Sequence, residues 1–99
     1  MKSAMMSLVL LFSTLGFAQS TQPKSAALCI ACHGANGISN NDLWPNLAGQ
    51  KKEYLHKQLM AFKSGERKDP LMSPIAANLS KEDMAELVNF FSGQSGSFK

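Results

Sequence analysis

The sequence predicts an all-α domain. Two segments, 51–63 and 80–93, carry apolar residues at the three- and four-residue spacing of an amphipathic helix, and no segment alternates as a strand would. Two loops, 33–50 and 64–78, are long for a chain of 99 residues. Loops of this length need something to fold around. We therefore expect three to four short helices wrapped around a bound group.

The first 18 residues have the pattern of a secretory signal peptide. One positive charge, Lys2, precedes an apolar run from Met5 to Leu15, and the small residues Gly16 and Ala18 follow. The run is shorter than the roughly 20 residues that span a bilayer. This favours export with cleavage after Ala18 over an uncleaved membrane anchor.

The net charge of the mature chain is too small to indicate a nucleic-acid partner. Removing Lys2 with the leader lowers the 10 basic side chains to nine, against seven acidic ones. A surplus of about two positive charges, with no run of lysine and arginine, does not support nucleic-acid binding.

The first two helices are separated by the first loop. Residues 25–32 contain good helix formers and no breaker, whereas 33–50 hold three glycines, a proline and four asparagines. In the second helix, 51–63, Leu55, Leu59 and Phe62 share one face, and Gly65 is the expected stop.

The last helix is the best marked. Ser80 is the expected N-cap, and an apolar stripe follows that comprises Met84, Leu87, Val88 and Phe91. Gly93 ends the helix. Residues 64–78, which contain two prolines, are expected to be loop.

The segment CIACH contains Cys29, Cys32 and His33 in the C-x-x-C-H pattern of c-type haem attachment. Two residues between the cysteines place the thiols about one helical turn apart. Each can then form a thioether with one of two vinyl groups on the same porphyrin edge. The adjacent imidazole can bind the iron as the proximal axial ligand.

Three other interpretations of the cysteine pair are weaker. A thioredoxin-like redox pair requires a βαβ context, which is missing. A structural zinc site requires four ligands, and His56 is the one obvious addition. An exported disulfide leaves His33 unexplained. We therefore favour haem attachment.

Met72 is the preferred second axial ligand. It lies in the predicted loop within DPLMSP, where Pro70 and Pro74 restrict the backbone and deny it a helix. Met60 and Met84 fall on helices, where methionine is usually core filler. His56, the rival ligand, is expected at the surface. With both axial positions filled by protein, the site is expected to carry electrons and not to be an enzyme.

The motifs together resemble a known family. CIACHG, WPNLAGQ, the middle helix and DPLMSP occur in the order found in class I c-type cytochromes. The resemblance is greatest to small bacterial single-haem domains, which occur alone or as halves of tandem di-haem cytochromes. It implies a cytochrome c domain over 27–93, after a flexible segment 19–26 that includes the start of the first helix, with a tail at 94–99.

The resemblance also implies roles for individual residues. Pro45 is expected to offer its carbonyl to the free ring N–H of His33, which fixes the imidazole, and Met72 matches the family's methionine ligand. Trp44, Tyr54 and Arg67 are candidates to bond the haem propionates. The expected apolar haem wall comprises Leu47, Leu55, Leu59, Phe62, Ile75, Leu79 and Leu87.

Two departures from the family pattern stand out. Few residues precede Cys29, so the crossing of the first and last helices is expected to be weak. The chain also carries one haem motif, so we expect a monohaem protein and not a tandem one.

The predicted function is that of a periplasmic monohaem cytochrome, with one covalent haem c, that cycles between Fe(II) and Fe(III). Its expected partners are a redox donor and acceptor, such as a respiratory complex, oxidase or dehydrogenase, with no nucleic acid and no stable membrane insertion. The alternative is a haem subunit bound tightly to a dehydrogenase, as in a flavocytochrome.

Overall fold

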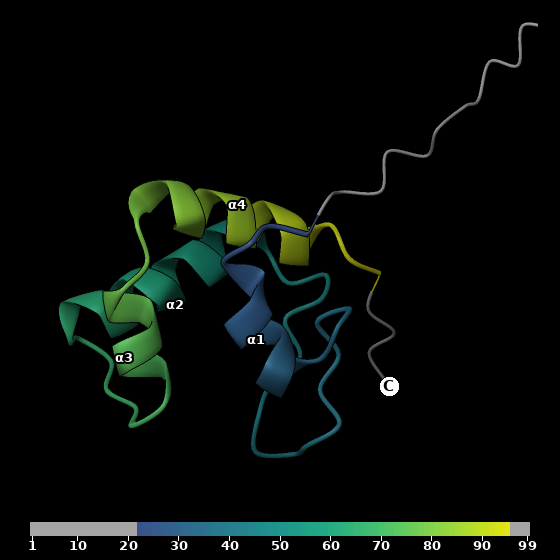
Figure 1. Ribbon diagram of the computed structural model, residues 1–99, viewed down its shortest axis with the longest axis horizontal. Helices are drawn as coiled ribbons and strands as arrows, with labels where there is room; N and C mark the ends of the chain where they lie inside the picture. The colour runs from purple at the N-terminus through teal and green to yellow at the C-terminus, as the bar shows by residue number, and fades with distance from the viewer. Residues whose placement is uncertain (1–21, 96–99) are drawn as a thin grey trace, which may run out of the picture.

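The structure, a computed structural model, describes residues 22–95 (Figure 1). Its four helices are α1 (Ala26–His33), α2 (Lys52–Ser64), α3 (Met72–Ala77) and α4 (Lys81–Ser92). No strand occurs among the described residues. The all-α prediction is confirmed. The predicted signal peptide, 1–18, lies outside the described part of the chain.

The core is organised by α4. Its N-terminus is closed by a capping box, in which Asp83 N–H donates to Ser80 Oγ and Ser80 N–H donates to the Asp83 carboxylate, both at 3.0 Å. Helix α2 packs against α4 and α3. The buried cluster is rich in α4 side chains and comprises Ala26, Cys29, Leu55, Leu79, Met84, Leu87, Val88, Phe90 and Phe91.

Helix α1 joins this core at its first turns. Ala26 is fully buried and Cys29 is 9% exposed, while Ile30 packs against the cluster from its edge. In Figure 1 the helix starts below the C-terminal half of α4 and runs away from it. Its packing against α4 is less extensive than that of α2 against α3 or α4, in line with the weak crossing expected from the sequence.

The segment between α1 and α2 is ordered without being helical. The Gly37 carbonyl accepts the N–H groups of Leu47 and Ala48, at 2.7 and 3.0 Å, which closes the loop on itself. Gly49 N–H donates to the Phe91 carbonyl at the end of α4, at 3.0 Å. The loop is thereby attached to the helix that organises the core.

The prediction that residues 64–78 lack a helix was wrong, since α3 begins at Met72. Pro74 is the third residue of α3, within the first turn, where a missing N–H breaks no intrahelical hydrogen bond. The N–H groups of Leu71 and Met72 instead donate to the Asp69 carboxylate, each at 2.8 Å. The two prolines therefore flank the helix start without preventing it.

The far end of α3 is held by α2. Lys63, in the last turn of α2, donates from Nζ to the carbonyls of Ala77, at 3.4 Å, and Leu79. These carbonyls lie at and just beyond the end of α3, where helical partners run out. Both termini of the short helix thus depend on side chains from outside it.

The two methionines expected to fill the core differ. Met84 is 1% exposed and lies in the core cluster, as predicted, whereas Met60 is 39% exposed on α2, so its prediction was wrong. The surface position expected for His56 is confirmed. Between residues 22 and 95, none of the helices has the length and apolar character needed to cross a membrane.

Candidate haem site

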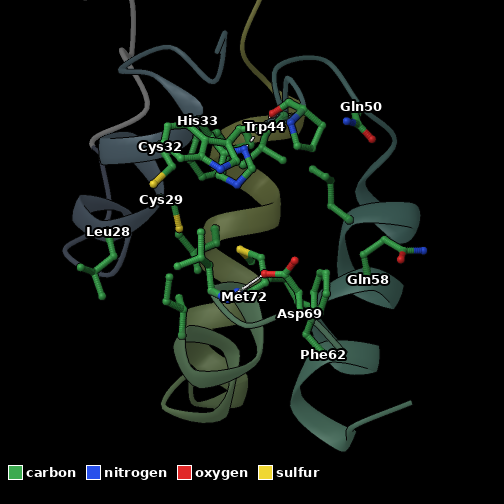
Figure 2. Close-up of a pocket in the computed structure, with 18 of the residues that line it drawn as sticks. Leu28, Cys29, Cys32, His33, Trp44, Gln50, Gln58, Phe62, Asp69 and Met72 are labelled. Carbon is green, nitrogen blue, oxygen red and sulfur yellow. Dashed lines mark hydrogen bonds between the residues drawn. The ribbon is translucent and has the colours of Figure 1, made fainter. Parts of the chain in front are cut away.

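A cavity of about 470 Å³ opens between α1, α2, α3 and the loop before α2 (Figure 2). All four helices contribute to its wall, including Leu87, Val88 and Phe91 of α4 at the side of the core. A volume of this size accommodates a cofactor-sized ligand. A ligand of this kind would be the bound group around which the two long loops are expected to fold.

The C-x-x-C-H segment forms the last turns of α1 and faces this cavity. Cys29, Cys32 and His33 all line it, and no disulfide joins the two thiols. Burial, and to a lesser degree the nearby Cys32, raises the pKa of the Cys29 thiol. Two free thiols one turn apart at the edge of an apolar cavity fit thioether attachment of a flat ring.

His33 is oriented by Pro45. The ring is 7% exposed, and Nδ1 lies 2.7 Å from the Pro45 carbonyl oxygen. A carbonyl can only accept, so the proton of the neutral imidazole resides on Nδ1 and the lone pair on Nε2 remains free. The side chain is therefore prepared to bind a metal through Nε2. Within residues 22–95, no three His, Cys, Asp or Glu side chains converge where they could hold a metal ion by themselves.

Met72 enters the same cavity from a different helix. Figure 2 shows its thioether and the His33 ring pointing into the space between α1 and α3. The Met72 backbone is fixed by Asp69, whose pKa is lowered by the N–H groups of Met72 and, next, of Leu71. An imidazole and a thioether thus approach one cavity from two elements, so both side chains could ligate an iron held there.

The residues expected at the propionates all reach the cavity wall. Trp44, Tyr54 and Arg67 line it, and Tyr54 is 51% exposed at its mouth. The Arg67 guanidinium lies 4.5 Å from the centre of the Phe62 ring and donates from Nη1 to Gln58 Oε1 at 2.7 Å. It is thus held in place by two α2 side chains.

Comparison with known proteins identifies the family. The family model described as "Cytochrome c" matches residues 23–95, most of the chain. The chain belongs to the cytochrome c family. Covalently bound haem c is accordingly its cofactor, and the cavity, the thiol pair and the available imidazole nitrogen fit that group.

Three relatives show which members of the family this cytochrome is similar to. Cytochrome c-554(548) of Halomonas halodenitrificans is 41% identical over 69 residues, covering 67% of this chain and 83% of the relative. Cytochrome c4 of Thiocapsa roseopersicina is 39% identical, and the match covers 81% of this chain but only 41% of the relative. The thiosulfate dehydrogenase electron acceptor of Thiomonas intermedia is 42% identical, and the match covers 71% of this chain and 33% of the relative.

A solved structure supports the fold. The crystal structure of reduced recombinant cytochrome c4 from Pseudomonas stutzeri superimposes with a TM-score of 0.63 at 38% identity, covering 68% of this chain and 38% of that one. The cytochrome c fold predicted from the sequence is confirmed. The chain spans about half the length or less of the cytochromes c4 that it matches, from 41% to 53% of the curated relatives, and corresponds to a single-haem domain.

The residues expected to form the apolar haem wall lie at the cavity, with one exception. Six of its seven members line the cavity: Leu47, Leu55, Leu59, Phe62, Ile75 and Leu87. Leu79 does not line the cavity and instead packs in the core cluster, 7% exposed. Leu79 follows the end of α3, a helix that was not predicted from the sequence, and the side chain was therefore assigned to the wrong side of the chain.

Several residues that line the cavity were not predicted from the sequence. Leu28, Leu43 and Leu71 line the cavity although they are 63%, 83% and 57% exposed, and the polar side chains of Gln50, Gln58 and Asp69 line it as well. The three leucines could have been predicted, because each directly precedes a residue already assigned to the site: Cys29, Trp44 or Met72. The roles of Gln58 and Asp69 depend on contacts across the fold, which spacing does not reveal.

Proposed function

We propose that this cytochrome is a periplasmic one-electron carrier whose haem is attached through Cys29 and Cys32 and ligated axially by His33 and Met72. The observation that supports this most directly is that the His33 ring, oriented through Nδ1 by Pro45, and the Met72 thioether enter one apolar cavity beside two free thiols.

The haem, when bound, supplies an iron that gains or loses one electron between Fe(II) and Fe(III). The protein's residues set how easily this happens. A thioether from Met72 favours the ferrous state relative to a second imidazole, and the apolar wall raises the potential further by excluding water. If His33 and Met72 both ligated the iron, oxygen and peroxide would find no open site on it, so we propose a carrier and not an enzyme.

Trp44, Tyr54 and Arg67 are proposed to bond the propionates at the mouth of the cavity. An indole N–H, a phenol and a guanidinium all donate to carboxylates. Arg67 is the best placed to do so without reorganisation, because Phe62 and Gln58 already fix its guanidinium.

The Met72→Ala variant tests the axial ligand. The ferric protein is expected to show the weak near-infrared charge-transfer band of sulfur-ligated haem, and Met72→Ala to lose it and to bind carbon monoxide when reduced. Met60→Ala is the matched control, because Met60 lies on α2 outside the cavity wall; it should retain the band and exclude carbon monoxide. An unchanged spectrum in Met72→Ala would refute the ligation.

A second candidate function is a haem subunit held permanently by a dehydrogenase. It is favoured by two relatives named as thiosulfate dehydrogenase electron acceptors, of which the protein of Thiomonas intermedia shares 42% identity over 71 residues. Gel filtration of native extract distinguishes the two candidates. A free carrier elutes as a small monomer, whereas co-elution with a large flavin-containing subunit would overturn the free-carrier proposal.

A further inference from the structure

Asp69 lies just before α3 and closes a ring of hydrogen bonds around the Met72 backbone. Its Oδ2 accepts the N–H groups of both Leu71 and Met72 at 2.8 Å. Its own N–H donates to Ser73 Oγ at 2.9 Å, and its carbonyl accepts Ser73 N–H at 3.0 Å. Four hydrogen bonds thus link Asp69 to the three residues at the start of α3.

Helix α3 cannot supply this order itself. It has six residues, far fewer than a helix needs to persist alone in water. The third of them is Pro74, which contributes no N–H. The backbone at Met72 is therefore determined by contacts from outside the helix, and Asp69 provides the contacts nearest to Met72.

The methionine side chain makes such an anchor necessary. It has three rotatable side-chain bonds and no branch, so its sulfur can be presented to one point only if the backbone that carries it is fixed. We propose that Asp69 is the positioning residue for Met72, holding its backbone so that the thioether remains directed into the cavity. The inference rests on the proposed ligation by Met72 and adds to it the residue that keeps the ligand in place.

Asp83 provides a matched control within the same chain. It too is a carboxylate that accepts a backbone N–H at a helix start, Ser80 N–H at 3.0 Å, but its helix, α4, carries no proposed iron ligand. Removing either carboxylate should lower the stability of a helix terminus. Only the loss of Asp69 should release the methionine.

The experiment compares Asp69→Ala, Asp69→Asn and Asp83→Ala as ferric holoproteins. Imidazole is titrated, and its competition with the methionine is followed by loss of the near-infrared band, with urea unfolding measured in parallel by far-ultraviolet circular dichroism. Because imidazole binds only when the methionine has dissociated, its apparent affinity reports the dissociated population. Loss of hydrogen bonds to a charged group should raise this affinity about tenfold or more in Asp69→Ala.

The controls separate positioning from stability. Asp83→Ala should shift the unfolding midpoint yet keep the imidazole affinity of wild type. Asp69→Asn, whose neutral amide oxygen accepts more weakly than a carboxylate, should lie between wild type and Asp69→Ala. If Asp69→Ala does not accumulate, Asp69→Asn decides: raised affinity supports the proposal, and wild-type affinity overturns it.

Failure of the two proposals can be told apart. If wild type lacks the near-infrared band, or Met72→Ala retains it, ligation by Met72 is wrong and the positioning role fails with it. If Met72→Ala loses the band but Asp69→Ala binds imidazole no more tightly than Asp83→Ala, Met72 remains the ligand and Asp69 does not position it.

Discussion

Gly37 occupies a position at which a side chain meets two obstacles. Its φ is +75°, in the left-handed region, and an added Cβ would lie 2.8 Å from the Ala48 nitrogen and 3.0 Å from Phe91 Cδ1. The first obstacle is conformational strain, and the second is a collision with the loop and with the core aromatic beneath it. Gly65 shares only the first, since its φ is +81° and nothing lies within 4 Å of its added Cβ.

This pair predicts two different losses of stability. Gly65→Ala should cost about 1–2 kcal/mol, the usual penalty for a left-handed alanine. Gly37→Ala should cost at least about 1 kcal/mol more, because overpacking adds to the strain. Urea unfolding of the holoprotein, followed by far-ultraviolet circular dichroism, measures both. Equal losses would show that the loop relaxes away from Phe91 at no cost.

At the scale of the elements, three helices were predictable because their own residues determine them. Helix α4 carries its cap, its apolar stripe and its terminating glycine within the sequence, and the structure places each as expected. The irregular loop before α2 was also foreseeable from its glycines, proline and asparagines. The attachment of this loop to α4 was not foreseeable, since the hydrogen bond from Gly49 to Phe91 joins residues far apart in the chain.

Helix α3 shows where local patterns fail. Two prolines and a length of six residues argue against a helix, and by itself the segment would not form one. It is stabilised by Asp69 at its start, by Lys63 at its end and by packing on α2. Such stabilisation is tertiary, so the sequence identified Met72 as a candidate ligand while misjudging the helix that carries it.

At the scale of the whole molecule, the wall of the candidate haem cavity is also one side of the hydrophobic core. Side chains from all four helices line it, and several of them, Cys29, Leu55, Leu87, Val88 and Phe91, belong at the same time to the core cluster. Domains of this size enclose only a small apolar core and often rely on a prosthetic group or another staple. A haem held in this cavity would therefore pack against the core residues and add to the apolar surface that the fold buries.

Preventing haem attachment should consequently unfold the protein. The double variant Cys29→Ala, Cys32→Ala can form no thioether, and we expect it to lose most of its helical signal and its cooperative thermal transition. Each single variant retains one thioether and should unfold cooperatively at a temperature between wild type and the double variant. The measurement is thermal unfolding by far-ultraviolet circular dichroism, with haem content determined after denaturing extraction. A double variant without haem that keeps wild-type helicity and cooperativity would show that the packing of α2 against α3 and α4 suffices to maintain the fold.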